Sequence, residues 1–253
     1  RFDFLYTDHG KPPVFASELE PLGSRFFGVT HRRTSLRGNR ADLEALFAQQ
    51  QFDILHFHAN TTSYVAPVNT ALQHRVPVIY HSHNAGASRS RVTRTLHWWH
   101  QRTLPWDRIT KVAVSSEAGR WMFGNQPFEV IPNGIDVDAF TFRLESRHAV
   151  RTDLGLDPKA FVVGSIAAFL PAKNHSFILS VFTEVLRRRP DAHLLLVGDG
   201  PLKQATREHA RDLGVGGHVS FVGRRADVPD LLSAMDALLM PSIHEGFPVV
   251  ILE

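Results

Sequence analysis

The sequence FVVGSIAAFLPAKNHSFILSVFTEVLRRRPDAHLLLVG, residues 161–198, decides the fold class. It contains two apolar runs, FVVGSI (161–166) and HLLLVG (193–198), that are typical of strands. Between them, residues 173–189 predict a helix, because apolar side chains recur at a helical spacing and form one stripe. The stripe consists of Phe177, Ile178, Val181, Phe182, Val185 and Leu186. A strand, a helix and a second strand in this order predict a parallel sheet covered by helices, and hence an α/β fold.

The same alternation of apolar runs and helical segments continues along the whole chain. Strands are predicted at 1–7, 25–29, 52–58, 76–83, 111–116 and 128–132, and then at 161–166, 193–198, 218–222 and 237–241. Further helices are predicted at 41–50, 64–75, 88–104, 201–214 and 227–235. The two sets of strands predict two sheets. The segment 138–160 has no clean period, so we place the domain junction there, between residues 1–140 and 141–253.

Composition excludes several classes of protein. The 253 residues include 43% hydrophobic residues and 18 Phe, enough to build two cores, which excludes a disordered or low-complexity chain. The absence of cysteine excludes disulfide frameworks, thiolate zinc sites, iron–sulfur clusters and cysteine nucleophiles. The chain begins without Met and stops at Glu253 inside an apolar run, so we expect it to be truncated at both ends.

Positive charge is concentrated in one segment of the first half. Residues 1–140 hold 15 Lys and Arg against 12 Asp and Glu, whereas residues 141–253 hold 13 of each, so the net charge of +3 lies in the first half. Between His81 and Lys111 the basic residues are interleaved with Trp98, Trp99 and Trp106. They are Arg89, Arg91, Arg94, Arg102, Arg108 and Lys111. Such a segment suits an anionic surface, either lipid headgroups or nucleic acid, and the alternative is an ordinary surface helix over 88–104.

Polar side chains gather where predicted parallel strands end, which is where open α/β sheets bind ligands. They are His81, Ser82, His83 and Asn84 after 76–83, Gly198, Asp199, Gly200 and Pro201 after 193–198, and Ser242, His244, Glu245 and Gly246 after 237–241. Each group has a plainer interpretation. Gly-Asp-Gly-Pro is also a common turn into a helix, and a histidine pair is more often structural than catalytic.

Four residues bear on whether the protein binds a metal or an anion. His81 and His83 point to one side of a strand, but no third ligand stands at metal spacing, so we expect no metal site. Lys173 opens a predicted helix, where the helix dipole disfavours a cation. An anionic ligand would explain this unfavourable placement. Glu253 interrupts an apolar run, which predicts a polar cavity around its carboxylate or a simple break to the surface.

Six motifs in order resemble a known family over almost the whole chain. They are HSHN (81–84), IPNGID (131–136), Lys173-Asn174-His175, VGDGP (197–201), FVGRRADVPDLLSAMD (221–236) and PSIHEGFPVVILE (241–253). The last contains two glutamates separated by seven residues. Together they are similar to the GT4 family of retaining, nucleotide-sugar-dependent glycosyltransferases, and most of all to its bacterial exopolysaccharide and capsule members. The resemblance implies the GT-B fold, in which two Rossmann-like parallel-sheet domains face a cleft.

The resemblance also implies roles for particular residues. Lys173 corresponds to the phosphate-binding lysine, Glu245 to the sugar-contacting glutamate and Glu253 to the ribose-binding one. The histidine near the transferred sugar matches His83 best, with His81 as the alternative. The expected catalytic residues are therefore His83, Lys173 and Glu245. The other donor-binding residues implied are Asn174, Gly198, Asp199, Gly223, Arg224, His244, Gly246, Phe247 and Glu253, with Asn84 and Asn133 as further candidates.

By resemblance, the expected reaction moves a hexosyl unit from a UDP- or GDP-linked sugar to a polysaccharide or lipid-linked saccharide. No metal, other cofactor or nucleic acid is expected. The expected location is the cytoplasm, with a peripheral contact to the anionic inner face of the membrane. Family members carry Gly-Arg where this chain has Ala167-Ala168, so the second phosphate-binding cation is missing. The alternative is therefore a catalytically impaired fragment or paralogue that binds the nucleotide-sugar without turnover. A nucleotide-sugar 2-epimerase is disfavoured by the EGFP-type motif.

Overall fold

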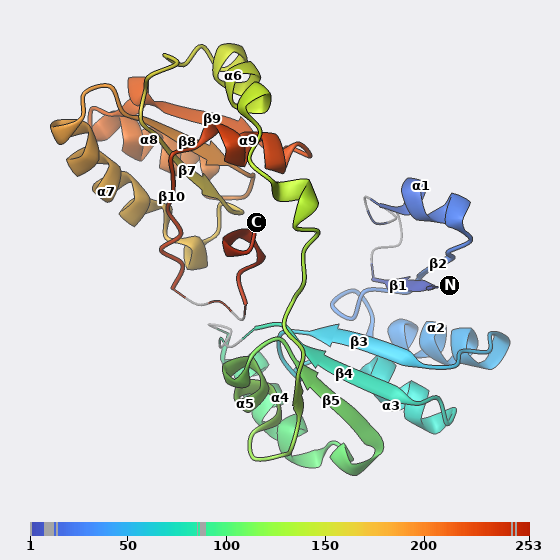
Figure 1. Ribbon diagram of the computed structural model, residues 1–253. Helices are drawn as coiled ribbons and strands as arrows, with labels where there is room; N and C mark the ends of the chain where they lie inside the picture. Colours follow the sequence, from blue (N-terminus) through green and yellow to red (C-terminus); the bar gives the residue numbers. More distant parts are fainter. Residues whose placement is uncertain are drawn as a thin grey trace. The chain divides into compact units, whose positions relative to one another are not determined.

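The computed structural model describes residues 2–7, 13, 15–84, 86, 90–243, 245 and 247–253. The chain divides into two compact units, Arg1–Ile131 and Pro132–Glu253 (Figure 1). The sequence placed the division after residue 140. In the structure the short 3-10 helix η3 (Asp138–Phe140) contacts helix α9 (Val228–Ala234), and both belong to the second unit.

The first unit contains a four-stranded parallel sheet in the order β3-β4-β5-β6. Its strands are β3 (Leu55–Ala59), β4 (Val78–Ser82), β5 (Ile109–Ala113) and β6 (Glu129–Val130). A separate parallel pair is formed by β1 (Phe4–Tyr6) and β2 (Phe26–Gly28). The helices are α1 (Ala16–Leu19), α2 (Leu36–Gln49), α3 (Ala66–Gln73), α4 (Arg91–Thr103) and α5 (Ser116–Phe123), with the 3-10 turns η1 (Glu20–Leu22) and η2 (Trp106–Arg108). Every strand predicted for this half is confirmed, whereas α1 and α5 were not predicted.

Strand β4 presents different chemistry on its two faces. The Tyr80 side chain is fully buried and its ring packs edge-on against Phe57, Trp106 and Phe123. The buried Ser82 hydroxyl, on the same face, donates to the carbonyl of Ala118 in α5. Because side chains alternate along a strand, the residue between them, His81, lies on the opposite face.

The second unit is a doubly wound sheet in the order β10-β7-β8-β9, again with all strands parallel. Its strands are β7 (Val162–Ile166), β8 (His193–Val197), β9 (Val219–Gly223) and β10 (Ala237–Leu238). The remaining helices are α6 (Leu144–Asp153), α7 (His175–Arg188) and α8 (Lys203–Asp212), with the 3-10 turns η4 (Pro171–Lys173), η5 (Gly216–His218) and η6 (Val249–Ile251). One core packs α7 and α8 on the sheet and a second core packs α6 and α9. The α/β fold with parallel sheets is confirmed.

Helix α7 is the helix that the apolar stripe predicts, but its buried side differs slightly. Ile178, Leu179 and Phe182 are fully buried and pack against β8 residues. Phe177, which the stripe included, is 51% exposed. The helix begins at His175, two residues later than predicted, and the buried side is therefore centred on the pair Ile178 and Leu179.

Helix α6 corrects the prediction of an irregular segment over 138–160. Polar contacts add to its apolar core, because the guanidinium of Arg151 is almost completely buried and donates to the carbonyls of Pro158, Ala160 and Ala234 and to Asp236. Arg147 binds the other oxygen of Asp236 at 2.6 Å. Apolar periodicity detects helices that bury apolar stripes, and a helix anchored by two arginines lacks that signal.

No helix in the described part of the chain combines the length and apolar character that crossing a membrane requires.

Candidate functional site

The loops that follow β7, β8 and β9 are joined to one another at the carboxyl ends of these strands. Three backbone bonds join them: Ala167 N–H donates to Val197 at 3.0 Å, Phe169 N–H to Asp199 at 3.0 Å, and Gly198 N–H to Gly223 at 2.8 Å. The strand ends that the sequence singled out in this half therefore form one continuous backbone surface. In doubly wound sheets this is the edge at which ligands bind.

Two glycines allow these loops to approach so closely. Gly198 has a φ of +136°, and a Cβ atom added there would lie 2.1 Å from the Ala167 carbonyl oxygen. Gly200 has a φ of +155°, and its added Cβ would lie 2.8 Å from the carbonyl oxygen of Phe169. Neither position accepts a side chain without moving the backbone, because both the conformation and the space are those of glycine.

Lys173 and Glu245 form an ion pair at this edge. Lys173 ends η4, which follows β7, and its Nζ donates to the Oε1 of Glu245 at 2.5 Å. The loop after β10 that carries Glu245 is attached to η4, because Ile243 N–H donates to Ala172 at 2.8 Å. About a quarter of each side chain remains exposed, at 26% and 23%. A cation and a carboxylate that solvent reaches are thus brought together from positions 72 residues apart.

The sequence predicted Lys173 at the start of helix α7, but the structure places it before the helix. Asn174 separates the two, in a left-handed conformation with a φ of 55°, and the helix starts at His175. The lysine therefore sits in a turn before the helix, where its backbone N–H donates to Leu170.

His175 and Ser242 carry buried polar atoms without partners in the described structure. The His175 ring stacks on Phe169 with centroids 4.2 Å apart, and its Nδ1 has no hydrogen-bond partner, like the hydroxyl of Ser242. Burial, and secondarily the charge of Lys173, lower the pKa of His175, so the ring is neutral at pH 7. Each unpaired atom costs about 1–3 kcal/mol, and a polar ligand would remove that cost. Sequence reasoning did not select His175, although it completes the Lys173-Asn174-His175 motif.

Asp199 is held as a carboxylate after β8. Its Oδ1 accepts the N–H of Gly200 at 2.8 Å and its Oδ2 faces the Nζ of Lys203 at 3.3 Å. These groups, the Gly200 amide first, lower the pKa of Asp199, and the exposed Arg224 adds to the effect. Lys203 was not predicted, and its spacing of four residues from Asp199 on a helical start is the signal that could have found it.

Predicted donor-binding residues also lie along the last segment of the chain, and one of them contacts Asn133. The side-chain amide of Asn133 donates to the carbonyl of Phe247 at 3.4 Å, so these two are brought together. Glu253 follows η6, is half-buried, and has its pKa raised by burial. His244 and Gly246 lie outside the described residues.

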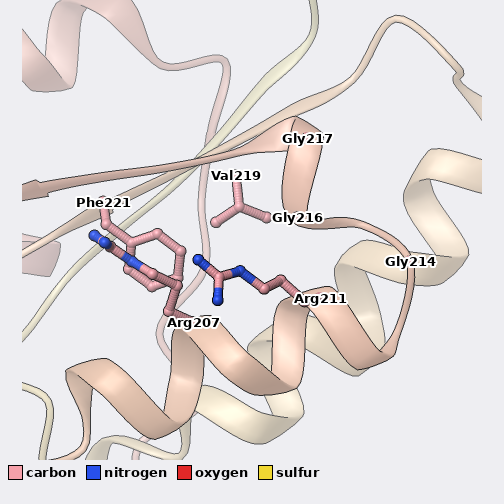
Figure 2. Close-up of a pocket in the computed structure, with 7 residues that line it drawn as sticks. All are labelled: Arg207, Arg211, Gly214, Gly216, Gly217, Val219 and Phe221. Atoms are coloured by element: carbon pink, nitrogen blue, oxygen red, sulfur yellow. The ribbon is translucent and has the colours of Figure 1, made fainter.

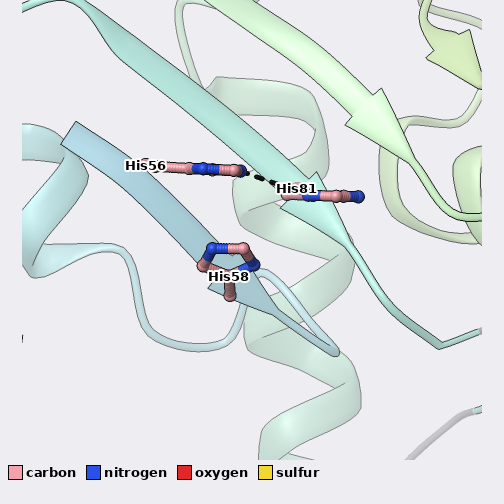
Figure 3. Close-up of side chains that lie close together, drawn as sticks. All are labelled: His56, His58 and His81. Atoms are coloured by element: carbon pink, nitrogen blue, oxygen red, sulfur yellow. Dashed lines mark hydrogen bonds between the residues drawn. The ribbon is translucent and has the colours of Figure 1, made fainter. Parts of the chain in front are cut away.

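In the first unit, the predicted His81 and His83 lie beside two histidines of β3. His58 and His81 are register partners on the paired strands β3 and β4. His56 Nε2 lies 3.1 Å from His81 Nδ1 (Figure 3). His58 Nδ1 lies 2.7 Å from His83 Nε2. Burial, and secondarily the neighbouring imidazoles, lower the pKa of His58 and of His81 to about 4. Burial also lowers the pKa of His56 and of His83, so all four rings are neutral imidazoles at pH 7.

This cluster changes the assessment of metal ligands. Sequence reasoning found no third ligand for His81 and His83, but His56, His58 and His81 each offer a ring nitrogen, all within 4.8 Å of one another. The His81 Nε2 and the Asn84 Oδ1 are buried without partners in the described structure. The missing signal was the pairing of β3 with β4, because the bonded histidines are 25 residues apart.

The basic segment divides between the interior and the surface. Trp106 is buried, and Lys111 Nζ donates to its backbone carbonyl at 2.6 Å. Trp98 and Trp99 of α4 are 54% and 55% exposed. The apolar side chains of Val92, Leu96 and Trp99 are exposed, and α4 buries His97. Arg89 lies outside the described residues.

Arginine side chains line several cavities in the described part of the chain, and two of these cavities lie on α4 and on α8. One, of about 750 Å³, runs along α4 and α5 and is lined by Arg91, Arg94, Thr95, His97, Trp98, Gln101, Arg120, Trp121 and Gly124. The other, of about 550 Å³, lies at the start of β9, and Arg207 and Arg211 of α8 point toward it (Figure 2). Arg207 stacks on Phe221 at 5.0 Å. This second cavity lies at the end of β9 opposite Gly223, away from the loops described above.

Comparison with known proteins assigns the family. Residues 3–139 match the model described as Glycosyltransferase Family 4, and residues 146–253 match the model described as Glycosyl transferases group 1. The putative glycosyltransferase EpsF of Bacillus subtilis (strain 168) is 30% identical over 100% of this chain and 68% of its own length.

Two further proteins extend the likeness. A UDP-Gal:alpha-D-GlcNAc-diphosphoundecaprenol alpha-1,3-galactosyltransferase of Escherichia coli is 24% identical over 83% of this chain, which spans 57% of that enzyme. The crystal structure of Anabaena HepE in complex with UDP and glucose matches 99% of this chain and 77% of HepE, with a TM-score of 0.77 and 21% identity. The chain thus spans more than two thirds of EpsF but less than two thirds of the galactosyltransferase. It belongs to glycosyltransferase family 4 and is a glycosyltransferase of the GT-B fold.

Proposed function

We propose that this chain transfers a hexosyl unit, with retention of configuration, from a nucleotide-sugar to a polysaccharide or lipid-linked saccharide. The observation that carries the proposal is the Lys173–Glu245 pair beside the joined loops of β7, β8 and β9. The printed names of relatives support the substrates. HepE was crystallised with UDP and glucose, and the Escherichia coli relative is named for a UDP-Gal donor and an acceptor linked to diphosphoundecaprenol. Two other relatives, each 34% identical over about half of this chain, are named for GDP-mannose, so both UDP- and GDP-linked donors remain part of the proposal.

The chemistry of the pair suits a leaving nucleoside diphosphate. Negative charge grows on the diphosphate as the glycosidic bond breaks, so a fixed cation near it lowers the barrier. Lys173 supplies that cation, and Glu245, which holds it at 2.5 Å in the free protein, is positioned to bind a sugar hydroxyl once the lysine turns to the phosphates. Lys173 and the backbone amides supply the positive charge, so the proposed reaction needs no metal or other cofactor.

The other residues take roles consistent with their positions. Gly198, Asp199, Gly223 and Arg224 are assigned to the base and ribose, because they follow β8 and β9 at the same edge as Lys173. Glu253 is assigned to the ribose hydroxyls. Asn174, His244, Gly246 and Phe247 complete the donor contacts, and His83 in the first unit is assigned to the transferred sugar, with His81 as the alternative.

Nucleoside diphosphate binding tests the donor site. Calorimetric titration of UDP and of GDP should show saturable binding that Lys173→Ala weakens about 10- to 100-fold, since a hydrogen bond to a charged group contributes about 1.5–3 kcal/mol. Lys159→Ala is the matched control, because Lys159 is exposed in the same unit before β7. If the two variants bind UDP and GDP with equal affinity, Lys173 does not contact the nucleoside diphosphate. Saturation-transfer NMR with a panel of nucleotide-sugars would then identify the donor.

A second candidate function is donor binding without turnover. Ala168 is exposed in the loop after β7, at the position where the family's Gly-Arg places a second cation. Loss of one such group costs about 100- to 1,000-fold in rate. Ala168→Arg should therefore raise donor turnover, whereas Ala168→Gln, of similar bulk but without charge, should not. Equal turnover in the two variants would contradict this assignment of Ala168.

Helix α4 supports a proposal for reaching a lipid-linked acceptor. It exposes Trp98 and Trp99 beside Arg91 and Arg94, and its groove extends to Arg120. Such a face suits an anionic cytoplasmic leaflet, where each basic residue contributes about 1 kcal/mol. Co-sedimentation with phosphatidylserine vesicles should fall roughly 30-fold in the double variant Arg91→Gln and Arg94→Gln. The double variant Arg187→Gln and Arg188→Gln is the control, and equal binding to neutral vesicles would refute the contact.

A further inference from the structure

The histidines of β3 and β4 form a cluster that the transferase function does not require as a whole. His56 and His58 are two residues apart and share a face of β3, and His58 pairs in register with His81 of β4. Paired strands lie about 4.8 Å apart, so the three rings extend from neighbouring points on one face of the sheet. Figure 3 shows the three rings gathered there.

The spacing of the ring nitrogens suits a metal ion. Three nitrogens bound tetrahedrally at about 2.0–2.1 Å from zinc lie about 3.3 Å from one another. His56 Nε2 and His81 Nδ1 are already 3.1 Å apart. A nitrogen of His58 completes a group whose members all lie within 4.8 Å of one another, so a rotation of its ring brings it to the required distance.

A second observation points to a ligand. The other ring nitrogen of His81, Nε2, is buried and has no partner in the part of the chain that the structure describes. A neutral imidazole that shares one nitrogen with His56 and leaves the other unpaired is incompletely satisfied. A metal ion bound by His56 Nε2 and His81 Nδ1 needs a lone pair on both atoms, so the proton between them in the free protein moves to the second nitrogen of the ring that carries it.

His83 is not one of the three ligands, but it forms a hydrogen bond with one of them. Its Nε2 lies 2.7 Å from His58 Nδ1. Histidines that bind metals almost always use their second ring nitrogen in a hydrogen bond that fixes the ring's orientation. His58 therefore keeps Nε2 for the ion, while His83 holds its Nδ1.

We propose that His56, His58 and His81 bind one divalent transition-metal ion of the zinc class, with His83 orienting His58. Three imidazole nitrogens favour zinc, nickel, copper or cobalt over magnesium or calcium, which prefer oxygen ligands. The three histidines leave a fourth coordination position for water, as in zinc sites that are not closed. The proposal rests on the geometry of the first unit and is independent of the donor site at Lys173.

Metal titration of the tag-free, metal-stripped protein tests the proposal. Calorimetry with Zn²⁺ should show one equivalent bound, and Co²⁺ should develop the intense visible bands of four-coordinate cobalt. His83→Gln removes a hydrogen-bond partner of a ligand and should weaken Zn²⁺ binding roughly 10- to 100-fold. His56→Gln and His81→Gln each remove a ligand and should weaken it at least as much. His148→Gln is the control, because His148 is exposed on α6 in the other unit.

Imidazole NMR on the unmutated protein gives a readout that does not depend on how the variants fold. Zn²⁺ should shift the ring nitrogen signals of His56, His58 and His81 and leave His148 unchanged. Absence of the cobalt bands, an affinity that His56→Gln and His81→Gln leave unaltered, or shifts confined to other histidines would each overturn the proposal.

Discussion

Replacing Gly198 by alanine should distort the joined loops of the donor site. The added Cβ would lie 2.1 Å from the Ala167 carbonyl oxygen, and ordinary contacts begin at 3.4 Å, so the two backbones must separate by about 1.3 Å. Gly198 also donates to Gly223, so the shift reaches the loop after β9 as well. A misplacement of about 1 Å at a reacting site costs roughly 100-fold in rate.

The same change should lower the free energy of unfolding. The φ of +136° costs a residue with a side chain about 1–3 kcal/mol, and the crowding adds about 1–3 kcal/mol. Alanine substitutions at two other glycines distinguish the cost of the backbone conformation from the cost of the crowding. Gly214 has a φ of +72° with open space around an added Cβ, so Gly214→Ala should cost about 1–2 kcal/mol from conformation alone. Gly217 has open space without a positive φ, so Gly217→Ala should stay within about 0.5 kcal/mol.

Urea unfolding and calorimetric titration with UDP measure both effects on the three variants. Gly198→Ala should be the least stable and should bind UDP about tenfold or more weakly, which corresponds to one displaced charged hydrogen bond. Gly214→Ala should lose stability and keep its affinity for UDP. If Gly198→Ala and Gly214→Ala have the same urea midpoint, and Gly198→Ala binds UDP like the unmutated chain, then the loops accommodate the added Cβ without cost and the steric reasoning is wrong.

Two further predictions concern the stability of the second unit. Arg151→Ala should lower the free energy of unfolding by about 3–5 kcal/mol, because Asp236 and the carbonyls of Pro158, Ala160 and Ala234 each lose a partner; a loss below 1 kcal/mol in urea titration would contradict this. Burial, with a smaller contribution from His218, lowers the pKa of His193 to about 4 in the folded state, whereas the unfolded value is about 6.5. Below pH 6.5 the unfolded chain takes up a proton that the folded chain does not, so the free energy of unfolding falls as the pH falls toward 4. The loss of stability between pH 7 and 4 should therefore be smaller in His193→Gln, and identical pH profiles would exclude the effect.

The strands could be predicted because parallel strands covered on both faces are short apolar runs, and each run is visible without knowledge of its neighbours. The residues at the ends of these runs followed from topology alone, since parallel strands present their carboxyl ends at one edge. Glu245 was selected in this way and Lys173 by its place at a predicted helix start, and the structure brings them into contact across 72 residues.

The remaining features depend on pairings that a single sequence does not display. The metal-ligand cluster needs β3 beside β4, and nothing in the spacing of His56 and His81 reveals that neighbour. Helix α6 was missed because Arg147 and Arg151 replace the apolar stripe with bonds to Asp236 and to carbonyls near the end of α9. The α7 boundary shifted because Asn174 adopts a left-handed turn that the helical pattern does not mark.

The attachment of α6 to Asp236 has a consequence for synthesis on the ribosome. Arg151 and Asp236 are 85 residues apart in the chain, so the arginine is translated long before its carboxylate partner exists. At about 5–20 residues per second, this interval lasts roughly 4 to 17 s. During it the guanidinium of Arg151 can reach the carbonyls of Pro158 and Ala160, which are made soon after it, but it lacks the carboxylate of Asp236. This half of the enzyme therefore completes its fold only after the strand β10 has left the exit tunnel, and a nascent chain arrested before Asp236 should remain open to proteases.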